Sequence, residues 1–354
     1  MSSTAPLITA SSERRITSID TMKVVAILAV ICLHTGPFGD SQYSGSFFRA
    51  FAVLINQASR FAVPFFFLVS GFFFGRSLRM GAHPRELFLR YFWRLLVVFM
   101  VWSVIYAFVP KEFSSNVPVW ELIQAHLQKT IHWISEHPII FLLQGTRVHL
   151  WFLPALITSL FIITLFVTAK LDWYVLCLSI FLYTIHLLNG PYSQTSLGFH
   201  SDLNTLNTPL TGAVFTTIGW SLAYRPIPRL LLAYGLLIGG FALHNLEAFF
   251  LHQRYHFDLS EHHYLIGTVP FAMGVLLMCL IHPQLGNKTF LPNLGKLTLG
   301  IYVSHFLALD ILSPFKEWVS GPLWEFTFPF LVYILALGMT LLLARSRYSK
   351  SIVT

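Results

Sequence analysis

Charged side chains are scarce in this 354-residue chain, at 11% of all residues, while hydrophobic residues make up 55%. Soluble domains carry about 25% charged residues, so this composition excludes a soluble fold and is typical of a protein that crosses a membrane many times. Cysteine is also scarce, and Cys32, Cys177 and Cys279 all fall within hydrophobic runs. Cysteines in such positions behave as small hydrophobic residues, so we expect no disulfide framework.

No stretch of the sequence has the composition of a second, soluble domain. Residues 1–13 are polar, and the hydrophobic run after them is too long for a cleaved signal peptide and lacks a clear small-residue cleavage site. We therefore predict a polar N-terminal tail at 1–13, one transmembrane domain at 14–345 and a cytoplasmic C-terminal tail at 346–354. The absence of a convincing internal repeat counts against a secondary transporter.

Hydrophobic runs long enough to cross a bilayer predict an all-α, polytopic integral membrane protein with about ten transmembrane helices. These runs lie at 17–37, 48–75, 88–110, 148–169, 172–189, 207–224, 229–250, 263–281, 297–313 and 322–344. Most of the 23 lysines and arginines fall in the loops that are inside if the N-terminus is inside. Because cytoplasmic loops are enriched in these residues, we predict that both termini are cytoplasmic.

The formal net charge of +8 reflects this topology and contact with anionic membrane lipids. The basic residues lie in short loops next to the predicted spans and are not interleaved with aromatic residues, so nucleic-acid binding is not expected. The external loop at 111–147 has hydrophobic residues at mostly three- and four-residue spacing, which predicts an amphipathic helix on the outer membrane interface that can roof a cavity.

Two ionisable residues, Lys23 and His34, lie in the first predicted span, eleven positions apart. Eleven residues make almost three helical turns, so both side chains lie on one face, roughly 16 Å apart along the axis. Ionisable groups within a membrane helix are costly and usually face an interior cavity. The pair therefore predicts a cavity wall with a cation near the cytoplasm and an imidazole near the outer side.

Arg60 lies in the outer half of the second predicted span. An arginine there either faces inward with a functional or structural role or extends its side chain to the membrane surface. Arg76 and Arg79, three residues apart, follow at the cytoplasmic end of the same span. The enrichment of basic residues inside accounts for such arginines, but paired guanidinium groups also suit the phosphates of a nucleotide-like cofactor.

Three further residues are candidates for the site. His149 begins the fourth predicted span, in a position where interfacial histidines are common. Tyr302 and His305 lie three residues apart on one face of the ninth predicted span, where a hydrogen bond between helices is the simplest role.

Taken together, these motifs resemble the acyltransferase 3 family of multi-pass membrane acyltransferases along essentially the whole chain. The resemblance is closest to stand-alone members that O-acetylate bacterial surface polysaccharides, such as the enterobacterial common antigen O-acetyltransferase. It rests on Lys23-x10-His34, Ser-Arg-x-x-Val-Pro-x-Phe-Phe-x-x-Ser-Gly at 59–71, Arg76-x-x-Arg79, His149-Leu-Trp-Phe-Leu153 and the stretch from Gly295 to His305.

The resemblance implies an acyltransferase-like transmembrane domain in a bacterial cytoplasmic membrane. It implies transfer of an acetyl group from cytoplasmic acetyl-coenzyme A to a hydroxyl of a cell-surface polysaccharide or lipid-linked glycan. His34 then matches the essential histidine of the family, Lys23 matches an arginine-or-lysine position, and Arg76 and Arg79 match proposed coenzyme A contacts.

Elementary chemistry agrees with this reading. A neutral imidazole at His34 can remove the proton of a sugar hydroxyl as that hydroxyl attacks the thioester, although an acyl-histidine intermediate is equally compatible with the sequence. Arg60 or His149 can stabilise the oxyanion, and Tyr302 and His305 can line the cavity or orient the imidazole. Cys32 is a poor nucleophile candidate because it does not share a helix face with His34.

Other readings remain on the sequence alone. The same polar residues can bind a glycan or a small anion in a transporter or flippase that performs no acyl transfer, and the scaffold can carry a succinyl or another acyl group. Four histidines surround the external loop after the seventh predicted span, but no carboxylate or cysteine completes a zinc pattern, so no metal is expected. Glu247 and Asp310 stay unassigned. The four histidines are His252, His256, His262 and His263.

Overall fold

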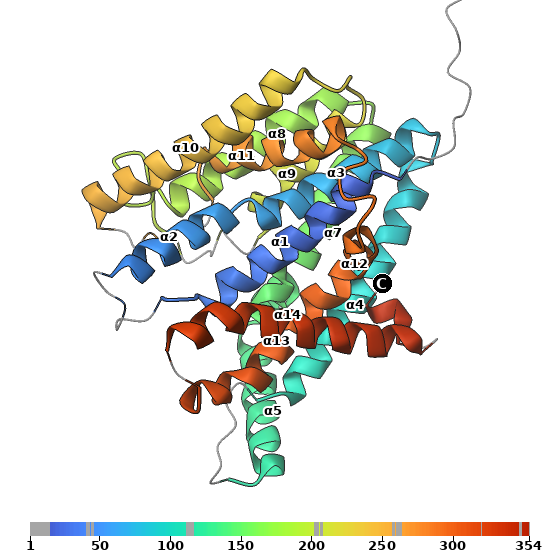
Figure 1. Ribbon diagram of the computed structural model, residues 1–354. Coiled ribbons are helices and arrows are strands. Elements are labelled where there is room, and N and C mark those ends of the chain that lie inside the picture. Colours follow the sequence, from blue (N-terminus) through green and yellow to red (C-terminus); the bar gives the residue numbers. More distant parts are fainter. Residues whose placement is uncertain are drawn as a thin grey trace, which may run out of the picture.

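The computed structural model describes residues 15–39, 43, 46–110, 117–201, 205, 208–256, 259, 264–319, 321–346 and 349–353. Within these residues the regular structure is entirely helical, which confirms the predicted all-α class (Figure 1). The predictions for the tail at 1–13 and for His262 and His263 lie outside the described residues.

The helices follow one another along the chain with short connections. They are α1 (Thr17–Thr35), α2 (Phe47–Ser59), α3 (Ala62–Arg79), α4 (Pro84–Phe108), α5 (Val119–Glu136), α6 (Pro138–Gln144), η2 (Val148–Trp151), α7 (Phe152–Thr168), α8 (Asp172–Asn189), α9 (Pro209–Leu222), α10 (Leu230–Tyr255), α11 (Thr268–Ile281), α12 (Leu291–Leu294), η3 (Gly295–Leu297), α13 (Thr298–Leu312), η4 (Ser313–Glu317), α14 (Pro322–Arg345) and η5 (Lys350–Ile352).

In the described part of the chain, eight helical segments are long and apolar enough to cross a membrane. Two shorter apolar helices, Leu210–Leu222 and Thr268–Ile281, coincide with the sixth and eighth predicted spans. The outward face of α10 carries large hydrophobic side chains, with Leu231 83% and Leu246 68% exposed. Such a face is suited to lipid rather than water, in agreement with a multi-pass membrane protein.

The second predicted span is divided into α2 and α3 at Arg60. Pro64 accounts for the break, because a proline ring clashes with the carbonyl group four residues earlier, which here belongs to Arg60. Pro64 itself lies in the first turn of α3, where a missing N–H costs little. The break brings the polar side chain of Arg60 into the protein interior, where it is only 4% exposed.

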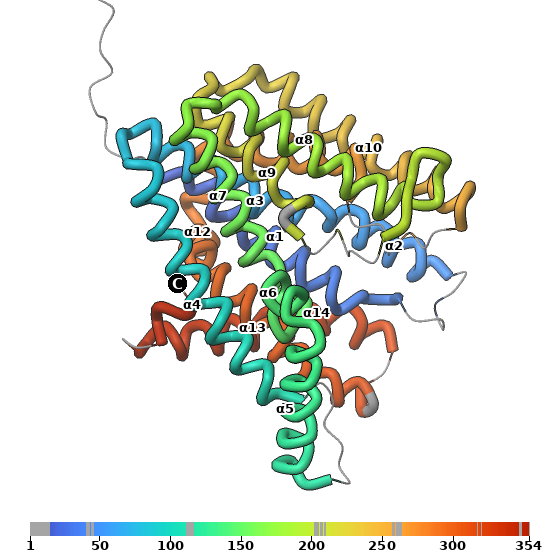
Figure 2. The backbone as a smooth tube through the Cα atoms, turned by 180° about the vertical axis from the view of Figure 1, so that it is seen from behind, coloured from blue at the N-terminus to red at the C-terminus, as the bar shows by residue number. Residues whose placement is uncertain are grey.

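Helix α1 occupies the middle of the molecule, between the α2–α3 pair and the α13–α14 pair (Figures 1 and 2). Helices α8 to α11 cover the far side of α3, and α3 packs very closely on α9. A Cβ atom at Gly71 of α3 would lie 1.9 Å from the carbonyl oxygen of Thr216, and one at Gly219 of α9 would lie 2.0 Å from that of Leu68. Small residues allow such close approach between membrane helices.

The C-terminal residues fold back onto the helices. Trp102 of α4 donates from its indole Nε1 to the carbonyl oxygen of Ile352 at 3.0 Å, and Val353 is fully buried. This segment therefore fills a space beside α4, α13 and α14.

Candidate active site

Three histidines from three separate segments meet beside α1. The ring centroid of His305 on α13 lies 5.4 Å from that of His34 on α1 and 5.0 Å from that of His149 on η2. Phe306 stacks on His149 at 4.3 Å and meets the edge of His34 at 4.8 Å. The structure thus joins His34, His149 and His305 into one cluster, here called the histidine cluster.

The members of the histidine cluster differ in their access to water. His149 is 1% exposed and His305 is fully buried. His34 is exposed, although α1 is surrounded by α2, α3, α11, α13 and α14. Of the three histidines, His34 is therefore the one that solvent reaches.

Hydrogen bonds indicate which nitrogens of the two buried rings carry protons. Nδ1 of His305 bonds to the carbonyl oxygen of Tyr302, and Nε2 of His149 bonds to that of Val303 at 3.4 Å. A nitrogen facing a carbonyl oxygen must be the protonated one. Nε2 of His305 and Nδ1 of His149 then carry lone pairs, and neither has a hydrogen-bond partner among the described residues.

Arg60 lies within electrostatic range of His34. Its Nε donates to Oδ1 of Asn56, one turn earlier in α2, at 3.0 Å. Tyr264 is also buried close to the Arg60 guanidinium.

A cavity of about 390 Å³ lies on the cytoplasmic side of the histidine cluster, as the lysine and arginine distribution orients the chain. Three cations, Lys23, Arg94 and Lys296, line it together with one carboxylate, Asp20. Lys23 bonds to Asp20 at 3.1 Å and lies over the ring of Phe73 at 5.6 Å. The lining therefore carries an excess of positive charge.

The deep end of this cavity is aromatic. Tyr302 lines the cavity, is 6% exposed, and donates its hydroxyl proton to the carbonyl oxygen of His149. Its ring centroid lies 5.5 Å from Phe152 and 5.8 Å from both His149 and His305. The Tyr302 ring therefore separates the charged cavity from the histidine cluster.

The two remaining sequence-predicted residues lie farther from the cluster. Phe66, Val69, Ser70 and Phe73 form the cavity face of α3, and Arg76 is partly buried one turn beyond them toward the cytoplasm. Arg79 is turned toward α9 and donates to the carbonyl oxygen of Ala223 at 3.0 Å.

A buried ion pair supports the cluster from the outer side. Arg147, directly before η2, donates to Asp310 of α13 at 2.7 Å, and both side chains are almost fully buried. The Arg147 guanidinium also lies over the ring of Tyr106, 5.4 Å from its centroid, and the Tyr106 hydroxyl donates to the carbonyl oxygen of Val303 at 2.7 Å. The pair ties the segment carrying His149 to the helix carrying His305.

Sequence reasoning did not select Arg94, Lys296 or the Arg147–Asp310 pair. The first two are indistinguishable in sequence from other cytoplasmic basic residues.

Glu247, which the sequence left without a role, accepts hydrogen bonds from the backbone N–H groups of Ile266 and Gly267, each at 3.0 Å. Among the described residues no group of three or more His, Cys, Asp or Glu side chains is arranged so that it could hold a metal ion, the histidine cluster included.

Comparison with known proteins agrees with this architecture. The family model described as "Acyltransferase domain" matches residues 16–345. An amino-acid racemase of Enterococcus faecalis is 24% identical over 330 residues, which cover 87% of this chain and 43% of that protein. A serine/alanine racemase of Enterococcus gallinarum is 25% identical over 151 residues, which cover 41% of this chain and 19% of that protein. The chain thus spans less than half the length of either relative, and no solved structure matches.

Proposed function

We propose that this chain, which belongs to the acyltransferase 3 family, is an O-acetyltransferase of the bacterial cytoplasmic membrane. It would move an acetyl group from cytoplasmic acetyl-coenzyme A to a hydroxyl of a cell-surface polysaccharide or lipid-linked glycan. The observation that carries the proposal is the order of three features from the cytoplasmic side outward. The cationic cavity at Lys23 of α1 comes first, the ring of Tyr302 from α13 lies next, and the accessible imidazole of His34 lies farther along α1.

The charge of the cytoplasmic cavity suits the donor. Coenzyme A carries several phosphate charges at one end and an uncharged pantetheine arm at the other. Lys23, Arg94 and Lys296 would hold the phosphates, and the aromatic deep end would take the arm. Arg76, one turn beyond the cavity face of α3, would extend the phosphate contacts at the mouth of the cavity. Arg79, at the end of α3, would contribute a further positive charge to the same phosphates.

His34 would act as the general base. Its accessible imidazole would remove the proton of the acceptor hydroxyl as the hydroxyl oxygen attacks the thioester carbonyl carbon. The carbon–sulfur bond then breaks, and the coenzyme A sulfur leaves with the proton that His34 had taken. Reaction requires the thioester to pass the Tyr302 ring, so that ring would have to move when the donor binds.

The two buried histidines would orient His34 rather than touch the acceptor. His305, with its proton fixed on Nδ1, presents the Nε2 lone pair as an acceptor for a His34 N–H. This arrangement would leave the other nitrogen of His34 free to accept a proton. His149 likewise presents a lone pair, so the donor needed at the oxyanion would come from the guanidinium of Arg60.

The test is to incubate purified full-length protein with acetyl-coenzyme A labelled in the acetyl group and with candidate surface glycans. Wild-type protein should transfer label to a glycan, and His34→Ala should lose about 10²- to 10⁴-fold in rate while still binding the donor. His282→Ala, at an exposed histidine after α11, is the matched control and should behave as wild type.

Several results would contradict the proposal. Equal transfer by wild type and His34→Ala would remove His34 from the mechanism. Failure of wild-type protein to bind acetyl-coenzyme A would favour transport without acyl transfer. Label retained on the protein before any acceptor is added, and lost in His34→Ala, would replace direct transfer by an acyl-histidine intermediate.

A further inference from the structure

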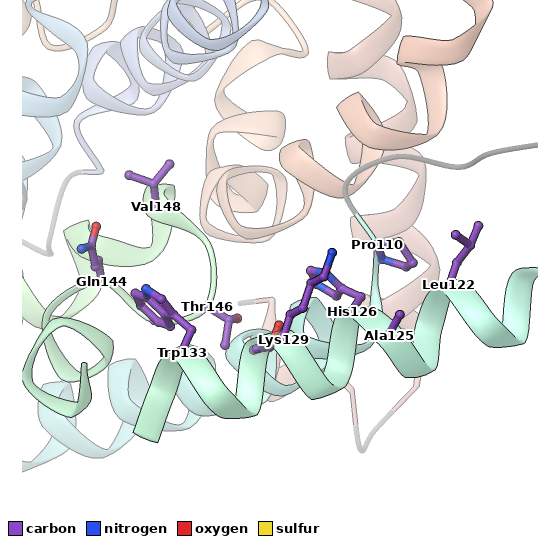
Figure 3. A pocket seen from close by; sticks show the side chains of 11 residues that line it. Pro110, Leu122, Ala125, His126, Lys129, Trp133, Gln144, Thr146 and Val148 are labelled. Carbon is purple, nitrogen blue, oxygen red and sulfur yellow. The ribbon is translucent and has the colours of Figure 1, made fainter. Parts of the chain in front are cut away.

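A second cavity, of about 590 Å³, lies outside the histidine cluster (Figure 3). Helix α5 forms one wall, and the turn from α6 to η2 forms the other. Its volume falls within the range of about 300–1,000 Å³ that small-molecule sites occupy. None of the roles proposed above involves the side chains that line it, so its purpose has to be sought in their chemistry.

The two faces of α5 differ in character. His126, Lys129 and Trp133 lie at three- and four-residue spacing and face the cavity, where Figure 3 shows them projecting from α5. Trp120 and Ile131 lie on the opposite face and are 64% and 58% exposed. Large apolar side chains exposed on one face suit a helix to rest on the outer membrane surface. The cavity therefore lies at the level where the head of a lipid-linked molecule would be.

The lining combines the groups that bind a charged sugar. The indole of Trp133 provides a flat apolar surface for the C–H face of a sugar ring, and Gln144 and Thr146 provide an amide and a hydroxyl. Lys129 adds a positive charge, and the described residues that line the cavity include no carboxylate. An apolar surface with a few polar groups and a positive charge that no lining carboxylate balances indicates an anionic, partly apolar ligand.

The inner wall of this cavity adjoins the histidine cluster through one residue of the chain. Val148 lines the cavity, and the next residue along the chain is His149. Thr146 is fixed by donating its hydroxyl proton to the carbonyl oxygen of Ser103 at 2.7 Å, and Arg147 is fixed by its ion pair with Asp310. A ligand on this wall would be held by the same rigid turn that positions His149.

We propose that this cavity binds a sugar residue that carries a carboxylate or phosphate, as the acceptor subsite of the enzyme. The inference rests on the proposed O-acetyltransferase function, since it names the class of glycan that the enzyme modifies. Trp133 stacks on the sugar ring, Lys129 neutralises the negative charge, and Gln144 and Thr146 bind hydroxyl groups. The rest of the glycan then extends toward His34.

Binding can be measured without catalysis. Saturation-transfer NMR on the full-length protein in lipid nanodiscs would use D-glucuronate as the charged probe and D-glucose as the neutral one. Wild-type protein should give a clearly larger transfer signal with glucuronate. Trp133→Ala should reduce that signal about fivefold or more, the loss expected for one stacked aromatic contact. Lys129→Gln should reduce the glucuronate signal to the level of glucose.

The matched control is Trp120→Ala, which removes the same side chain from the opposite face of the same helix and should leave the signal unchanged. Equal loss in Trp120→Ala and Trp133→Ala would overturn the proposal. So would a glucuronate signal that inorganic phosphate abolishes at equal concentration, because the site would then be a simple anion site. His34→Ala should bind glucuronate normally. If wild-type protein transfers no acetyl group but its glucuronate signal still depends on Trp133, the proposed reaction fails and the sugar site stands.

Discussion

The imidazole of His34 on α1 lies 5.4 Å, centroid to centroid, from the imidazole of His305 on α13. His34 is accessible, whereas His305 is fully buried and bonds through Nδ1 to the backbone of its own helix. The two rings therefore suit different tasks. In the proposed mechanism the accessible ring meets the substrate, and the fixed ring holds its neighbour in one orientation and one tautomer.

His305→Phe should lower kcat about 10- to 100-fold and leave the KM for acetyl-coenzyme A unchanged, because it removes the lone pair that orients His34 but keeps a ring of similar size. His305→Gln, whose side-chain oxygen can accept a hydrogen bond, should recover part of the rate. Steady-state kinetics of acetyl transfer measures both. A drop confined to protein yield, with normal kcat in the folded fraction, would assign His305 to packing alone.

Arg94→Ala and Lys296→Ala should each raise the KM for acetyl-coenzyme A roughly three- to tenfold, because each removes one cation from the cytoplasmic cavity. Their kcat should change little. Arg85→Ala is the matched control, since Arg85 is an exposed arginine near the start of α4 that does not line this cavity. Similar KM values for all three variants would show that the phosphates bind elsewhere.

Asp310→Asn should destabilise the protein strongly, by about 3–5 kcal/mol, because it leaves the buried guanidinium of Arg147 without its counter-charge. Thermal unfolding of the purified protein measures this. The double variant Arg147→Met with Asp310→Leu should lie much closer to wild type, since neither charge is then buried alone. Glu136→Gln, which breaks the exposed pair with His132, should cost less than about 1 kcal/mol. A double variant as unstable as Asp310→Asn would contradict this account.

Gly71→Ala should destabilise the membrane domain, because its methyl group would overlap the backbone of α9 at Thr216. Gly235→Ala, in α10, meets nothing within 4 Å and should be neutral or stabilise slightly, by up to about 1 kcal/mol, as alanine favours helix over glycine. Comparison of the two melting temperatures tests the close α3–α9 packing. If both substitutions have the same effect, the two helices do not approach as closely as described.

Much of the fold could be predicted from hydrophobic runs, because each membrane helix must be long and apolar. The predicted span at 48–75 lies within the candidate span Phe47–Arg79, although its helix is divided at Arg60. Pro64 carried the signal for this break, but a proline in a membrane helix often only bends it. The shortness of the helix at Thr268–Ile281 depends on packing against neighbours and leaves no mark in composition.

The site was less predictable than the fold. The spacing of Lys23 and His34 predicted a shared face, and the structure places Lys23 in the cytoplasmic cavity and His34 in the histidine cluster, both toward α13. That His149 would join the cluster was not evident, because its contact with Phe306 brings together residues more than 150 positions apart. The roles proposed for Arg76 and Arg79 remain predictions.

The Tyr302 ring has a consequence for the cell as well as for the reaction. A water-filled passage through a membrane protein would conduct protons and other ions. It would dissipate the ion gradient that the membrane maintains. The Tyr302 ring lies between the charged cavity and the histidines, so in the proposed reaction it would keep a barrier to ions in place except when the acyl donor displaces it. A smaller residue at this position would be expected to make the membrane leaky before it made the enzyme slow.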